Sequence, residues 1–131
     1  MKYMLIMNSP RDGYDQYMKW PKKDLEANIA FMQAFAKKLA AAGELVDTVG
    51  LASPQQAKRV RAGADSRPIT DGVFPEAKEY LAGYWLVDVD SAERAYEIAG
   101  EASTAPGPGI AGADHFWIEV REVMGSHQDI R

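Results

Sequence analysis

The stretch YWLVDVDSAERAYEIAG, residues 84–100, places a strand directly before a helix. Residues 84–89 are almost all aromatic, β-branched or aliphatic, which is typical of a strand. Asp90 can cap the helix that follows, with Glu93 three residues later as its capping-box partner. We expect that helix over residues 91–100, where one stripe of side chains can pack on a sheet: Ala92, Ala95, Tyr96 and Ala99.

A second strand–helix unit precedes it. Residues 2–8 (KYMLIMN) form a short apolar run, which predicts a strand buried on both faces and central in its sheet. Residues 9–20 contain Pro10 and Gly13 and predict a loop. The spacing over residues 21–42 predicts a helix, with Pro21 in its first turn and Gly43 as its stop. Its apolar stripe comprises Leu25, Ile29, Met32, Ala36 and Leu39.

The remaining segments complete the order. We expect strands over residues 44–51 and 115–123, and a hairpin of residues 57–61 and 67–70. Asp71-Gly72 indicates a turn and residues 75–81 a short helix. The predicted fold is therefore α+β, a ferredoxin-like βαββαβ arrangement with an inserted hairpin. Two helices can cover one sheet face, and the other face needs cover, most simply from a second copy of the chain.

The last predicted strand separates two sets of side chains. Alternation sends Phe116, Ile118 and Val120 to the helix-facing core. The opposite face receives a mixed aromatic and charged set: His115, Trp117, Glu119 and Arg121. This set is too polar for a core, and it suits a pocket or a polar interface between subunits.

Composition limits the classes of function. The chain has 131 residues and a net charge of −4, which argues against nucleic acid as a main partner. It contains no cysteine, so thiolate zinc sites and a cysteine nucleophile are absent. Neither a secretion signal nor a membrane-spanning segment is found, so we expect a cytoplasmic protein without membrane contact. We expect a single domain over residues 1–125 and a C-terminal tail over 126–131.

Residues 71–98 resemble the YCII-related proteins of the DGPF type. The matching positions are Asp71, Gly72, Phe74, Glu76, Lys78, Glu79, Gly83, Tyr84 and Trp85. The opening residues 2–7 and the closing residues 118–121 also fit the pattern. The resemblance implies a dimeric α+β barrel with a pocket between sheet and helices in each subunit. It implies no established activity, although genes of this type often lie beside extracytoplasmic-function sigma factors.

Two positions depart from that resemblance. Val73 stands where the group usually has proline, so the loop is less pre-organised. The enzyme-like YCII branch carries a His–Asp pair whose histidine lies early in the first helix, but residues 20–25 contain no histidine. That dyad cannot be transferred to this chain, and whether the protein is an enzyme stays open.

Candidate catalytic residues are Asp71 and His115, as acid, base or hydrogen-bond acceptor. The structural alternatives are that Asp71 caps a turn while Phe74 fills core, and that His115 is a partly exposed strand-end side chain. A metal site at Glu76 and Glu79 is not expected, because no histidine lies nearby in sequence.

Candidate ligand-binding residues flank these groups. Lys78 and Arg121 could hold an anion, with Glu79 and Phe74 beside them. Trp85 and Trp117 could form aromatic walls of a pocket, and core or dimer packing is the alternative for both. Two hypotheses follow: an isomerase- or lyase-like enzyme acting on a small polar or anionic metabolite, or a non-catalytic ligand-binding or regulatory homodimer. Neither requires a cofactor.

Overall fold

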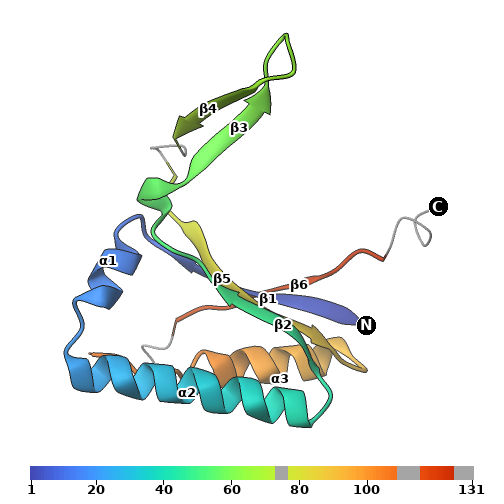
Figure 1. Ribbon diagram of the computed structural model, residues 1–131. Coiled ribbons are helices and arrows are strands. Elements are labelled where there is room, and N and C mark those ends of the chain that lie inside the picture. The colour runs from blue at the N-terminus through green and yellow to red at the C-terminus, as the bar shows by residue number, and fades with distance from the viewer. Residues whose placement is uncertain (73–76, 109–115, 126–131) are drawn as a thin grey trace.

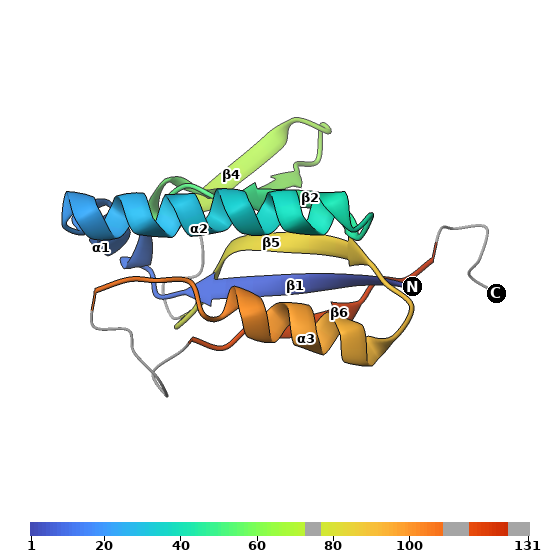
Figure 2. The same cartoon turned by 90° about the horizontal axis from the view of Figure 1, so that it is seen from below.

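The computed structural model describes residues 1–72, 77–108 and 116–125. A four-stranded sheet forms its centre, in the order β2-β5-β1-β6, and each neighbouring pair is antiparallel. Its strands are β1 (Lys2–Ser9), β2 (Leu45–Gly50), β5 (Tyr80–Asp88) and β6 (Glu119–Glu122). Helices α2 (Lys22–Ala41) and α3 (Ala92–Ala102) lie together on one face (Figures 1 and 2). The predicted ferredoxin-like fold is confirmed.

The predicted hairpin is also present. Strands β3 (Lys58–Ala62) and β4 (Pro68–Gly72) pair only with each other, as a separate two-stranded sheet. A short 3-10 turn, η1 (Pro54–Gln56), leads from β2 into this hairpin. In Figure 1 the hairpin rises from the side of the sheet opposite α2 and α3.

The core lies between the sheet and the two long helices. Its largest fully buried side chains are Leu5, Val87, Leu39 and Ile98. The rings of Trp85 and Phe35 meet edge to face, with centroids 5.8 Å apart, and join β5 to α2. Burying one aliphatic core side chain, such as Leu5 or Ile98, stabilises the fold by roughly 1.5–3 kcal/mol. This layer holds both helices against the sheet.

Helix α2 ends where the sequence predicts. Gly43 has φ +73°, and its N–H donates to the carbonyl of Ala40, while Glu44 N–H donates to that of Leu39. Together these bonds form a Schellman motif. The predicted stripe of α2, however, is partly wrong. Ile29 is 43% exposed, and Phe35 faces the core because its ring packs on Trp85.

Three local expectations are corrected. The predicted loop 9–20 contains helix α1 (Gly13–Met18). Asp71 and Gly72 belong to β4 rather than to a turn, and they pair with Arg59 and Lys58. The described part of the predicted helix 75–81 is not helical. Its last two residues start β5, because Tyr80 pairs with Ser9 and sheet pairing outweighs the local preference.

The strand and helix ends also differ in detail. Ser91, not Asp90, is the N-cap of α3, and its Oγ accepts from Arg94 N–H at 3.2 Å. Of the described residues in the predicted strand 115–123, only Glu119–Glu122 form β6. β1 is central as predicted, but Met4 and Ile6 are only half-buried, so one of its faces lacks full cover. The predicted tail 126–131 lies outside the described residues.

Candidate functional site

The sheet face turned away from the helices, here called the open face, is built from two cross-strand rows. Because side chains alternate along a strand, the neighbours of core residues Tyr3, Leu5, Trp85 and Val87 point to this face. Strand register places the rows side by side: Asp47–Leu86–Met4–Arg121 and Val49–Tyr84–Ile6–Glu119. Each row has a half-buried apolar or aromatic centre, and exposed residues stand on the two edge strands.

Two polar pairs stand at opposite edges of the open face. On the β2 edge, the Tyr84 hydroxyl donates to Asp47 Oδ2 at 3.1 Å. This hydrogen bond, together with desolvation and the carboxylate charge, raises the pKa of Tyr84 above its ordinary value. On the β6 edge, Arg121 Nε lies 3.7 Å from Glu119 Oε2. The polar pairs therefore frame an apolar centre of Met4, Ile6 and Leu86.

An open hollow of ≈ 510 Å³ lies where β1 ends and β5 begins. Trp117, 94% exposed, is the largest side chain of its wall. The described residues that line the hollow are Asn8, Glu79, Phe116, Trp117, Ile118 and Glu119. Two of these six are carboxylates and none is cationic. The arrangement favours a ligand that donates hydrogen bonds or carries positive charge, and the indole face adds a surface for a cation.

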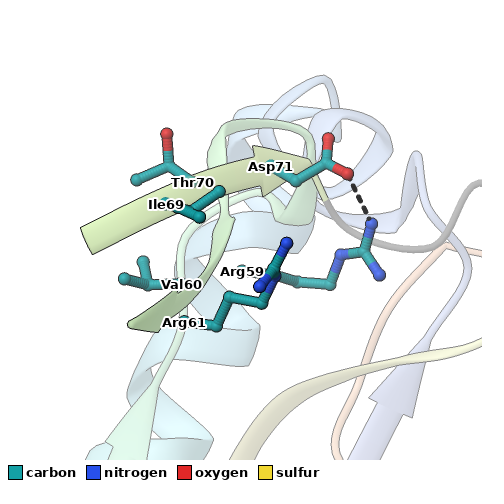
Figure 3. Close-up of a pocket in the computed structure, with 6 residues that line it drawn as sticks. All are labelled: Arg59, Val60, Arg61, Ile69, Thr70 and Asp71. Carbon is teal, nitrogen blue, oxygen red and sulfur yellow. Dashed lines mark hydrogen bonds and ion pairs between the residues drawn. The ribbon is translucent and has the colours of Figure 1, made fainter. Parts of the chain in front are cut away.

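Two of the predicted site residues, Asp71 and Lys78, do not line this hollow. Asp71 stands on β4 with a largely exposed carboxylate, and its Oδ2 accepts from Arg59 Nη2 at 2.9 Å (Figure 3). Its Oδ1 accepts from the N–H of Gly72 at 2.8 Å. Asp71 lines a smaller hollow on the hairpin itself. Lys78 is exposed just before β5 and lines neither of these two hollows.

The other predicted residues separate into three environments. Glu79 and Trp117 meet in the hollow beside β6. Trp85 is 4% exposed and lies in the helix-facing core against Phe35. Arg121 lies on the open face in its ion pair. Phe74 and His115 fall outside the described residues.

Sequence patterns did not identify the residues that complete these surfaces. Asn8 ends a strand, and an amide at that position carries no distinctive local signal. Asp47 and Tyr84 are 37 residues apart, so only the β2–β5 register reveals their hydrogen bond. Alternation in the last strand correctly placed Ile118 and Val120 against the core and Glu119 and Arg121 away from it, whereas Phe116, predicted in the same core set, lines the hollow.

A buried polar contact fixes the neighbourhood of α1. Asn28 of α2 is buried, accepts from the Tyr17 hydroxyl at 3.1 Å and donates to the carbonyl of Pro106 at 2.9 Å. Burial raises the pKa of Tyr17. The ring of Trp20 lies 4.9 Å from that of Tyr17. These bonds tie α1 and the segment after α3 to one point of α2.

A bidentate ion pair supports the opposite end of the fold. Both Arg94 Nε and Arg94 Nη2 donate to the Glu44 carboxylate at 2.8 Å. The Arg94 hydrogen bond is the main cause that holds the pKa of Glu44 below its ordinary value. The pair links the start of α3 to the start of β2, so its role is structural.

Residues 1–72, 77–108 and 116–125 contain neither a metal-binding cluster nor a membrane-spanning helix. No group of three or more His, Cys, Asp or Glu side chains there is arranged to hold a metal ion. In that part of the chain, no helix has the length and apolar character that crossing a membrane requires. Every buried side-chain nitrogen or oxygen described has a hydrogen-bond partner.

Comparison with known proteins assigns the family. The YCII-related domain matches residues 1–110, which include β1, β2, β5 and both long helices. The chain belongs to the YCII-related domain family. A relative, the uncharacterized protein R00369 of Rhizobium meliloti (strain 1021), is 31% identical over 86 residues. That alignment covers 66% of this chain and 69% of the relative. Family membership accords with the ferredoxin-like fold, and the named relative brings no activity with it.

Proposed function

We propose that this YCII-related protein is a ligand-binding homodimer whose two subunits stack through their open faces. The observation that supports this homodimer is the uncovered apolar centre of the open face. Met4, Ile6 and Leu86 are half-buried. The two long helices, α2 and α3, both lie on the opposite face of the sheet (Figures 1 and 2). A sheet face with such a centre is stabilised by a second layer, and a second copy is the simplest source of one.

The proposed ligand site is the hollow that contains Trp117. Stacked subunits would bring further cover to this nearly fully exposed indole, which the single chain leaves in water. Because Glu79 adds a carboxylate to a hollow whose described lining includes no cationic side chain, we assign the hollow to a small organic cation or amine. This choice differs from the anionic ligand expected from Lys78 and Arg121, since Arg121 already faces Glu119.

The alternative of acid–base catalysis has less support in the geometry. Asp71 forms its ion pair on the hairpin, while Glu79 and Trp117 meet at a different hollow. A general acid or base must reach the same substrate as the groups that bind it. A regulatory role beside sigma factors stays a prediction of the DGPF-type resemblance.

Sedimentation equilibrium tests the homodimer. At micromolar concentration we expect twice the 14.4 kDa chain mass. Leu86→Glu places a carboxylate at the centre of the open face and should give the monomer mass. Ile29→Glu is the matched control, because Ile29 is an exposed aliphatic residue of α2, on the helix side. A wild-type monomer, or a Leu86→Glu variant that stays dimeric, would overturn the homodimer.

Calorimetric titration tests the ligand class. Small primary and quaternary amines are titrated into the wild type and into Glu79→Gln and Trp117→Ala variants, with small carboxylates as the comparison panel. We expect amine binding that both substitutions weaken, each by about tenfold or more. Glu26→Gln is the control, because Glu26 lies on α2, at an exposed position. Binding of carboxylates alone would refute the assignment of a cation.

A further inference from the structure

The hairpin lacks a core of its own. Across residues 58–72 no residue is buried, and Val60 is 61% and Ile69 43% exposed. An isolated two-stranded hairpin in water is marginally stable at best. The hairpin nevertheless pairs in register over its whole length, from Lys58↔Gly72 to Ala62↔Pro68. Contact with a surface outside the hairpin would bury its exposed apolar side chains and stabilise it.

The place of the hairpin indicates where that surface lies. Figure 1 shows β3 and β4 rising on the side of the sheet away from α2 and α3, which is the side of the open face. Figure 2 shows the same hairpin beyond the β2 edge of the sheet. A protein packed on the open face would therefore lie beside the hairpin.

The charge distribution favours a second copy of this chain as the protein packed there. Residues 58–72 carry four basic and two acidic side chains, a net charge of +2, and the whole chain carries −4, which leaves −6 elsewhere. Arg59 pairs with Asp71 and Arg67 with Asp65 inside the hairpin, so its net charge comes from Lys58 and Arg61. The cationic hairpin of one copy and the acidic remainder of the other, here called the body, attract each other. Such complementary charge also selects against wrong orientations.

We propose that the β3–β4 hairpin is an arm that grips the body of a second copy of this chain, with Val60 and Arg61 as its contacts. The inference rests on the proposed homodimer and adds a specific element to it. In a two-fold dimer each arm grips the other body, so the contact occurs twice. The arm then acquires the apolar cover that it lacks within one chain.

Photo-crosslinking tests the contact directly. The chain contains no cysteine, so Val60→Cys carries the only thiol and accepts a benzophenone label at that single position. Irradiation should give covalent dimers whose cross-linked peptide belongs to the body rather than to the hairpin. Ala30→Cys, at an exposed position of α2, should give none. A sedimenting dimer without cross-links from position 60 overturns the arm but not the homodimer, whereas a monomer overturns both.

Charge reversal supplies a second, independent measurement. Arg61→Glu should weaken the dimer about tenfold, and the loss should shrink from ~0.05 M to ~0.5 M salt as screening increases. Lys37→Glu changes the net charge equally at an exposed position of α2 and should leave the dissociation constant unchanged. Circular dichroism verifies that each variant is folded. Equal weakening by both variants would mean a net-charge effect and would contradict the arm.

Discussion

Two glycines allow one prediction in which the same substitution has opposite effects. Gly43 follows α2 with φ +73°, whereas Gly100 lies within α3. A Cβ at either position meets no atom within 4 Å. Crowding therefore contributes nothing at either site, and only the backbone conformation distinguishes Gly43→Ala from Gly100→Ala.

The expected magnitudes follow from that conformation. The left-handed region costs a residue with a Cβ about 1–2 kcal/mol, and the smaller freedom of unfolded alanine offsets part of this. Gly43→Ala should thus lower the free energy of unfolding by ~1 kcal/mol. Gly100→Ala removes a poor helix former and should raise it by about 0.5–1 kcal/mol.

Urea unfolding followed by circular dichroism measures both values, at one fixed protein concentration because dimerisation makes apparent stability concentration-dependent. Thermal midpoints should move by about 4 °C, down for Gly43→Ala and up for Gly100→Ala. Gly43→Asn should fall between wild type and Gly43→Ala, because asparagine tolerates the left-handed region. Shifts of the same sign for the two alanine variants would refute the role assigned to φ.

Two further predictions concern polar contacts. Because the pKa of Glu44 is lowered in the fold, its stabilisation is complete above the unfolded value of ~4.3 and is lost as pH falls through the folded value. Melting from pH ~7 to ~3 should show Glu44→Gln converging on wild type, and a constant difference would contradict this. Tyr17→Phe leaves Asn28 Oδ1 without its donor and should cost ~1 kcal/mol in urea unfolding, whereas Tyr14→Phe, at an exposed position, should cost little.

Local signals in the sequence predicted most of the elements. Pro21 and Gly43 bracket α2, and both act through their own backbone conformation, which does not depend on distant residues. Alternation in the last strand assigned Ile118 and Val120 to the core. The hairpin was predicted from short strands around a turn, and its register confirms it.

Other features depend on tertiary contacts and were missed or misplaced. Tyr80 and Leu81 were predicted as helix, but pairing with β1 draws them into β5. Ile29 was predicted to be buried, yet the bulk of Phe35 against Trp85 sets the rotation of α2. The candidate residues Asp71 and Glu79 are close in sequence, but Asp71 lines the hollow on the hairpin and Glu79 lines the hollow beside β6.

The sequence by itself determined the order of strands and helices, because propensity, caps and alternation are properties of neighbouring residues. Only the tertiary structure decided which polar side chains meet on the open face. Asp47 and Tyr84 meet because β2 and β5 pair in one register, and a shift of one residue would turn Tyr84 toward the helices. Register is set by packing across the whole sheet, and no short segment of the chain contains that information.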